Sequence, residues 1–149
     1  MFQGQHVFTQ ITSFIPSRKF DALVKHYDGN KRIRNLDCRD QLLALLFGQL
    51  ANLRSLRGIV LCLNAHIPLL YHLGFKWRHF TLSTLSRANE SRNFRIYHDL
   101  AQALIVKARK LYLHDNDFTL ELEGAAYVLD STVIELCFSS FKWAYFELG

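Results

Sequence analysis

Asp130 is the residue whose type and surroundings point most directly to chemistry. It lies in AYVLDSTVIELCF, residues 126–138, an apolar stretch rich in β-branched and aromatic residues. A buried carboxylate without a partner is costly in desolvation free energy, so Asp130 needs a partner such as a cation. Mg²⁺ prefers oxygen ligands, and carboxylates that converge on two such ions activate the attacking oxygen in phosphodiester cleavage. Asp130 is therefore a candidate catalytic residue and metal ligand.

The same stretch also allows a structural role for Asp130. A local hydrogen bond to Ser131 or Thr132 would satisfy an aspartate at a turn or at a strand end. Glu135 does not supply a second ligand, because side chains five positions apart lie on opposite faces of a regular strand. The sequence by itself therefore identifies no complete metal site.

A second group of residues has the side chains that bind nucleic acid. Arginine pairs with phosphate and guanine, asparagine pairs with adenine, and the N-terminus of a helix attracts phosphate. Such residues follow Thr81 in a predicted helix, and a basic cluster, KRIR, lies in a predicted loop at 31–34. The candidate DNA contacts are Ser83, Thr84, Arg87, Arg92 and Arg95, with Lys31, Arg32 and Arg34 as backbone contacts. A capped helix with a solvated face, and a solvated loop, are the alternatives.

Charge divides the chain into two parts. Residues 1–110 hold seventeen Lys and Arg against six Asp and Glu, a net charge of +11, whereas residues 111–149 hold one against seven, a net charge of −6. A basic body favours a polyanionic partner, which the acidic end would repel unless a cation lies between them. An ordinary solvated basic surface is the alternative.

Helical patterns occupy the part of the chain that would position these residues. From Ser17, in SRKFDALVKHY, apolar residues recur at i, i+3, i+4 and i+7, and the stop signal Asp28-Gly29-Asn30 follows. Asp37 is a predicted N-cap for the apolar segment 39–53, which we expect to be a largely enclosed core helix.

Further helices are predicted at 56–65, 67–74 and 94–111. Ser55 opens the first, while Pro68 and Gly74 suit the first turn and the end of the second. In the third, apolar residues at alternating steps of three and four predict a core-facing stripe. The stripe consists of Phe94, Tyr97, Ala101, Leu104, Ala108 and Leu111.

The helical pattern ends near residue 112. HDNDF breaks it, and residues 125–149 favour β-strands through their alternation and their β-branched content. We therefore predict a mainly α chain, with a helical N-terminal domain at 1–112 and a linker at 113–124. Residues 125–149 would begin an α/β domain whose first strands lack partners for their backbone groups.

Composition excludes several classes of protein. Half of the residues are apolar and 13% are aromatic, which is typical of a folded domain rather than a disordered tail. No apolar run approaches the roughly 18 residues that cross a bilayer, and no secretory signal is visible, so we expect a cytoplasmic protein without membrane contact. Three widely spaced cysteines and the lack of an HxxxH pair argue against disulfides and a zinc site.

Three segments together resemble the N-terminal portion of bacterial insertion-sequence transposases of the insertion-sequence-four type. They are FTQITSFIPSRKFDALVKHYDGNKRIRNLDCRDQLLALLFGQLANLRSLRGIVLCLN, FTLSTLSRANESRNFRIYHDL and YVLDSTVIELCFSSFKWAYF, in which LDST is the most specific element. In that family a helical N-terminal domain precedes an RNase H-like domain with an Asp-Asp-Glu (DDE) catalytic triad. The resemblance implies that Asp130 is the first of these acids and that Mg²⁺ is the cofactor of the intact enzyme.

The family's second Asp and its Glu lie beyond residue 149. The resemblance therefore implies a truncated RNase H-like domain, in a chain that alone neither holds Mg²⁺ stably nor cleaves and transfers DNA strands. It also implies that the helical domain binds transposon-end DNA, with no small-molecule substrate.

Two alternatives to this reading stay open. One is a protein–protein interaction module that forms a homodimer, or pairs with full-length transposase, through the apolar residues Phe94, Tyr97, Leu104 and Leu111. The other is a non-functional transposase remnant.

Overall fold

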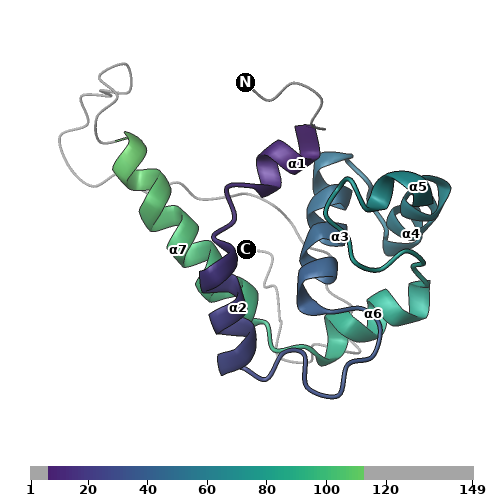
Figure 1. Cartoon of the computed structure of the whole chain (residues 1–149), viewed down its shortest axis with the longest axis horizontal. Coiled ribbons are helices and arrows are strands. Elements are labelled where there is room, and N and C mark those ends of the chain that lie inside the picture. The colour runs from purple at the N-terminus through teal and green to yellow at the C-terminus, as the bar shows by residue number, and fades with distance from the viewer. Residues whose placement is uncertain (1–6, 113–149) are drawn as a thin grey trace, which may run out of the picture. The chain divides into compact units, whose positions relative to one another are not determined.

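The computed structural model describes residues 7–112, and in this part of the chain the secondary structure is entirely helical (Figure 1). The mainly α class predicted from the sequence is confirmed for this range. The helices are α1 (Val7–Thr12), α2 (Ser17–His26), α3 (Cys38–Leu50), α4 (Leu56–Ala65), α5 (Ile67–Leu70), α6 (Leu82–Ser91) and α7 (Arg95–Tyr112).

Polar side chains begin three of these helices at the positions that the sequence predicts. Asp37 Oδ1 accepts a hydrogen bond from the Asp40 backbone N–H at 2.7 Å, which caps α3. Ser55 Oγ accepts from the Gly58 N–H at 3.1 Å and caps α4, and Thr81 Oγ1 accepts from the Thr84 N–H at 3.2 Å and caps α6. Each bond satisfies one of the N–H groups that a helix leaves without a partner in its first turn.

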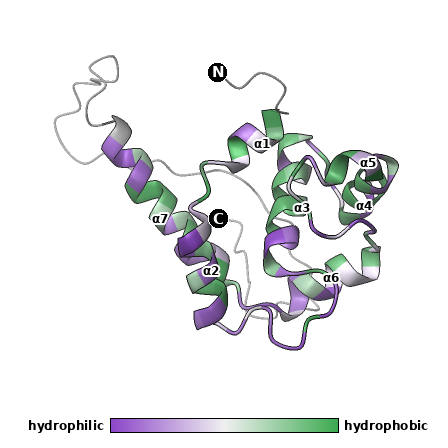
Figure 2. Ribbon diagram, viewed as in Figure 1, coloured by the Kyte–Doolittle hydropathy of each residue, from purple (hydrophilic) through white to green (hydrophobic). Residues whose placement is uncertain are grey.

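Helix α3 packs closely on α4, and both helices contribute residues to the larger hydrophobic cluster. Gly48 faces Ile59 so tightly that a Cβ at position 48 would overlap the isoleucine side chain. Leu43, Ala44 and Leu63 are buried in the same cluster, which also includes residues of α5, α6 and the segment before α6. Figure 2 shows the hydrophobic residues gathered on α3, α4 and α5, while the loop between α2 and α3 is largely hydrophilic.

The enclosure of α3 is less complete than its apolar sequence predicts. Its buried residues include the polar Asp40 and Gln41 besides Leu43 and Ala44, whereas Leu50 is 55% exposed. The helix therefore buries one side together with two polar groups, and both of these groups have structural partners.

Two polar side chains, the buried Asp40 of α3 and the partly buried Asn64 of α4, fix the segment that leads into α6. Asp40 accepts hydrogen bonds from the backbone N–H groups of Lys76 and Trp77, at 3.0 and 2.8 Å. Asn64 accepts from the Phe80 N–H and donates to the Phe80 carbonyl, at 2.9 and 2.7 Å. Burial raises the pKa of Asp40, while the two amides oppose that rise. These bonds hold the backbone before α6 against α3 and α4.

Helices α2 and α7 lie side by side around the smaller hydrophobic cluster (Figure 1). Phe20, Cys38, Ile96 and Leu100 are buried there. Gly29, just after α2, lies so close that an added Cβ would be 2.5 Å from Ile96 Cδ1 and 2.8 Å from Cys38 Sγ. A side chain at position 29 would therefore push the loop away from α3 and α7.

The core-facing stripe predicted for 94–111 is confirmed only in part. Ile96 and Leu100 are the buried residues of this segment, whereas Phe94 is 69% exposed and Ala101 is exposed. Tyr97 and Leu104 are partly buried against the chain's own smaller cluster. Apolar residues occur on both sides of α7, so the spacing alone does not determine which side packs on α2.

The strands predicted within 125–149, and with them the start of an RNase H-like domain, lie outside the described residues. The described residues all belong to the first of two compact units, Met1–His114. Within residues 7–112, none of the helices combines the length and the apolar character needed to cross a membrane.

Replacing Gly48 by alanine is expected to destabilise the fold. The added methyl group overlaps Ile59, so α3 and α4 must separate, at a cost of about 1 to 3 kcal/mol in unfolding free energy. Denaturant titration followed by circular dichroism measures the change. Gly58→Ala is the matched control, because the nearest atom to its added Cβ is Ser55 Oγ at 3.3 Å. Equal stability of the Gly48→Ala and Gly58→Ala variants would show that the close helix contact is absent.

Removing the Tyr27 hydroxyl is expected to weaken the pH dependence of stability on the acid side. The Tyr27 hydroxyl donates to Asp99 Oδ2 at 2.7 Å and, together with His98, holds the pKa of Asp99 below its ordinary value. An acid with a lowered folded pKa stabilises the fold above its unfolded pKa of about 3.9, and that stabilisation is lost as pH falls through the folded pKa.

The thermal midpoint of Tyr27→Phe should therefore change less between neutral and acid pH than that of the wild type. Tyr71→Phe, which removes a hydroxyl from a 69% exposed tyrosine, is the control and should follow the wild-type curve. If the thermal midpoints of Tyr27→Phe and the wild type depend on pH in the same way, the Tyr27 hydroxyl does not lower the pKa of Asp99.

Candidate functional site

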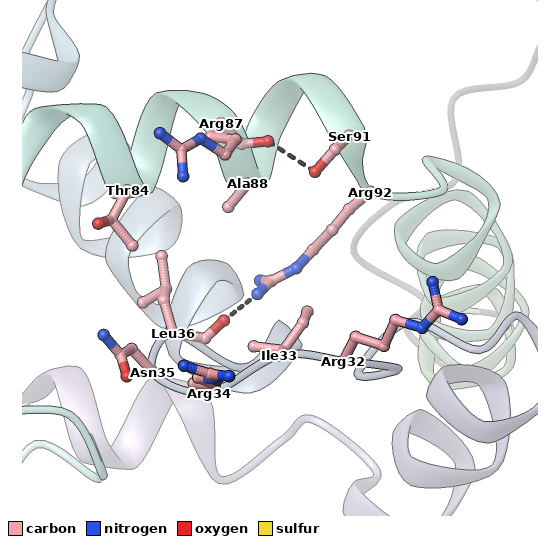
Figure 3. A pocket seen from close by; sticks show the side chains of 10 residues that line it. All are labelled: Arg32, Ile33, Arg34, Asn35, Leu36, Thr84, Arg87, Ala88, Ser91 and Arg92. Carbon is pink, nitrogen blue, oxygen red and sulfur yellow. Dashed lines mark hydrogen bonds between the residues drawn. The ribbon is translucent and has the colours of Figure 1, made fainter.

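Two segments about fifty positions apart in the sequence form one basic pocket (Figure 3). One is the loop between α2 and α3, and the other is α6 with the residue that follows it. We call this the arginine pocket; its volume is about 310 Å³. Its lining consists of Arg32, Ile33, Arg34, Asn35, Leu36, Thr84, Arg87, Ala88, Ser91 and Arg92. This lining includes four arginines and no acidic residue, so the pocket favours an anion.

The loop side of the arginine pocket is held by its two ends. At the start, Asp28 takes a left-handed conformation with φ 52°, and the Gly29 N–H donates to the Val24 carbonyl at 2.8 Å, which closes α2. At the end, Asn30 Oδ1 accepts from the Cys38 N–H at 2.8 Å and so ties the loop to the first residue of α3. Arg32, between these anchors, is also left-handed with φ 60°.

The helix side of the pocket is one face of α6. Thr84, Arg87, Ala88 and Ser91 are spaced i, i+3, i+4 and i+7, which brings them onto the same side of a helix. Ser91 Oγ donates to the Arg87 carbonyl at 2.7 Å, so its hydroxyl hydrogen is already used. Arg87 and Arg34 are exposed and approach the pocket from opposite sides, one from α6 and one from the loop (Figure 3).

Arg92 joins the two sides from inside. Its Nη1 donates to the Asp37 carbonyl at 2.8 Å and to Gln41 Oε1 at 2.6 Å, and its Nη2 donates to the Leu36 carbonyl (Figure 3). These bonds occupy the guanidinium group within the protein. Arg92 therefore has a structural role, which is to connect the end of α6 to the start of α3, and the DNA contact predicted for it stays a prediction.

Gln41 is the centre of the polar network to which Arg92 belongs. Its side chain is 2% exposed, its Nε2 donates to Asn89 Oδ1 at 2.6 Å, and its Oε1 also accepts from the Tyr97 hydroxyl at 2.7 Å. Burial raises the pKa of Tyr97, which keeps the phenol protonated and able to donate. The network thus connects α3 with α6, α7 and Arg92.

Three other predicted DNA contacts do not line the arginine pocket. Lys31 Nζ forms an exposed ion pair with Asp28 at 2.9 Å and lies beside a different hollow. Ser83 is exposed but does not belong to the pocket lining, unlike its neighbour Thr84. Arg95 is exposed at the start of α7 and interacts electrostatically with Asp99. The predicted DNA contacts that do line the pocket are Arg32, Arg34, Thr84, Arg87 and Arg92.

Sequence reasoning missed the roles of Asn35, Ser91 and Gln41. Asn35 and Ser91 line the pocket, and Gln41 organises the network below it. One signal was available for Gln41, because an amide inside the apolar run of α3 needs buried partners. Nothing comparable marks Asn35 or Ser91, since polar residues in a loop and at a helix end are common.

A second hollow, of about 350 Å³, is lined mainly by apolar residues of α1, α4 and α5 together with Cys62 and His66. His66 Nδ1 is bonded to the Cys62 carbonyl at 2.9 Å, so the pair is a local helix contact. This hollow has no converging charged groups and offers no chemistry comparable with that of the arginine pocket.

Asp130, the predicted catalytic residue and metal ligand, lies outside the described residues. Between residues 7 and 112 no group of three His, Cys, Asp or Glu is arranged to hold a metal ion. Cys38 and Cys62 are both free thiols, and burial raises the pKa of Cys38. The site that the described residues do form is the arginine pocket, whose lining is basic.

Comparison with known proteins gives one match. Residues 3–76 match a family described as a domain of unknown function (DUF4372), which is often found in transposase-related proteins. No curated protein matches the chain, and no solved structure matches it. The match covers α1 to α5 and the loop side of the arginine pocket, but not α6.

Replacing Arg92 by lysine is expected to lower the free energy of unfolding by about 1 to 3 kcal/mol, because a single ammonium group cannot reach all three carbonyl oxygens and leaves buried acceptors without donors. Denaturant titration measures the loss. Arg87→Lys is the matched control on the same helix; its side chain is exposed, so its stability should stay within about 0.5 kcal/mol of the wild type. Equal effects of the two substitutions would refute the structural role of Arg92.

Proposed function

We propose that the helical part of this chain is a DNA-binding module of a transposase-related protein, and that it binds phosphate groups through the arginine pocket. The observation that supports this proposal is that Arg32 and Arg34, from the loop, line the same pocket as Arg87, from α6. Two basic segments that are far apart in the sequence meet at one open pocket with no acidic side chain in its lining.

The electrostatics of the pocket favour a polyanion. Arg34 and Arg87 are exposed, and no hydrogen bond within the described residues occupies either guanidinium group. When such groups neutralise phosphates, counterions leave the DNA, and this release is the main source of affinity in sequence-independent binding. The net charge of +11 over residues 1–110 adds a longer-range attraction.

The transposase part of the proposal rests on the sequence. It is supported by the resemblance around LDST and by the DUF4372 match at residues 3–76. Among residues 7–112, no three His, Cys, Asp or Glu side chains are grouped so that they could hold Mg²⁺, so we assign no step of phosphodiester cleavage to them. In this proposal they contribute DNA binding, and catalysis belongs to the complete DDE enzyme.

A second candidate is self-association, and the exposed apolar residues of the last described segment favour it. Phe94, Ile105 and Val106 are 69%, 43% and 54% exposed. Tyr97 and Leu104 are no longer available for such an interface, because they pack against the chain's own core.

Removing the pocket charges is expected to weaken DNA binding. Arg34→Gln and Arg87→Gln should each raise the Kd for duplex DNA about fivefold, or about 1 kcal/mol, and lower the salt-dependence slope by about 1. Fluorescence anisotropy at several salt concentrations, with the whole 149-residue chain, measures both quantities.

Arg54→Gln and Arg57→Gln are matched controls, because both arginines are exposed and neither lines the arginine pocket. If the control substitutions weaken binding as much as the pocket substitutions, net charge rather than the pocket explains the affinity. A stable dimer that has no affinity for DNA in sedimentation and anisotropy would favour self-association instead.

A further inference from the structure

We infer that the arginine pocket holds the sugar–phosphate backbone of duplex DNA and does not read base sequence, an inference that rests on the proposed function. Base edges lie inside the grooves of DNA, so proteins that read them insert a protruding helix or β-ribbon. The arginine pocket is instead a hollow between a loop and the side of α6 (Figure 3). The sugar–phosphate backbone is the protruding part of a duplex, so it is the part that can enter such a hollow.

The lining of the pocket has the chemistry of a backbone site. Arg32 and Arg34 on one side and Arg87 on the other supply cations for phosphate oxygens. Ile33, on the loop side, is partly exposed and supplies apolar surface of the kind that packs against deoxyribose. Positive charge on both sides together with this apolar group matches a chain of alternating phosphate and sugar.

Groups that would read base edges are few in the pocket. The guanidinium group of Arg92 is bonded to Leu36, Asp37 and Gln41, so it cannot also approach a base. The hydroxyl hydrogen of Ser91 is bonded to the Arg87 carbonyl. Asn35 supplies the one amide of the lining. The remaining arginines can bind phosphate whatever the base sequence.

The exposed side of α6 that adjoins Arg87 is poorly suited to a recognition helix. Ser83, Ser86 and Glu90 are exposed there, and Ser83 and Glu90 lie four and three positions from Arg87. A carboxylate at Glu90 would face the negative potential of a DNA groove and oppose insertion of this side. The lining of the arginine pocket includes no such acid, so the pocket is the part of α6 that we expect to meet DNA.

The lining also distinguishes a duplex from a single strand. Proteins that bind single strands without sequence preference stack successive bases on aromatic side chains. The arginine pocket is lined by no aromatic residue. A single strand would leave its bases without stacking partners there, whereas a duplex keeps its bases stacked internally.

Fluorescence anisotropy with three labelled probes tests the inference on the whole chain. The probes are two duplexes of equal length and unrelated sequence, and one strand of the first duplex. The proteins are the wild type, the Arg34→Gln/Arg87→Gln variant and the control Arg54→Gln/Arg57→Gln. We expect the pocket variant to raise the Kd by the same factor on both duplexes, roughly tenfold or more, and the wild type to bind the single strand more weakly than its duplex.

Different failures have different meanings in this experiment. If the pocket variant loses affinity for only one of the two duplexes, the pocket reads base sequence. If the wild type binds the single strand as tightly as the duplex, and the pocket variant loses affinity for both by the same factor, the pocket is a single-strand site. Either result overturns the inference and leaves the proposed function standing. An unchanged Kd in the pocket variant would overturn the inference and would show that DNA binds elsewhere on the chain. Absence of salt-dependent binding of the wild type to every probe would overturn the proposed function as well.

Discussion

The buried amide of Gln41 is the constraint on which the arrangement of the other elements depends. An amide that is removed from water must keep its hydrogen bonds, and in a low-dielectric interior the loss of one is costly. The partners of Gln41 are Asn89, Arg92 and Tyr97, which come from α6, the residue after α6, and α7. The amide is satisfied only when these segments reach α3 together.

The arginine pocket is a consequence of this network. Apolar packing alone tolerates small shifts between helices, whereas hydrogen bonds to specific carbonyl oxygens do not. Arg92 binds the carbonyls of Leu36 and Asp37, so the end of α6 lies at a defined distance from the loop. The loop and α6, which carry the basic residues of the pocket lining, are therefore held in a fixed arrangement.

Structural context separates arginines and lysines that look alike in the sequence. Lys31 is paired with Asp28, Arg95 interacts with Asp99, and Arg92 is used inside the protein. Arg34 and Arg87 are exposed beside the pocket. The number of positive charges in KRIR or in the segment after Thr81 does not reveal which ones reach a ligand.

Local sequence signals predicted where helices begin better than they predicted which side of a helix is buried. The capping residues Asp37, Ser55 and Thr81 act within four residues of chain, so a sequence pattern is sufficient to find them. The buried side of α7 depends instead on distant groups, above all the lack of a side chain at Gly29, which admits Ile96. For the same reason the partners of Arg92 could not be predicted, since they lie more than fifty positions away.

At Arg32, which has a left-handed backbone, the stability of the loop and the positive charge of the pocket favour different residues. Residues other than glycine, asparagine and aspartate resist that conformation, at roughly 1 kcal/mol, and here the cost is borne at a position that lines the pocket. Glycine at position 32 would relax the loop and remove a cation from the pocket in the same change. Selection for a more heat-resistant chain and selection for tighter grip on an anion would therefore favour different residues at this position.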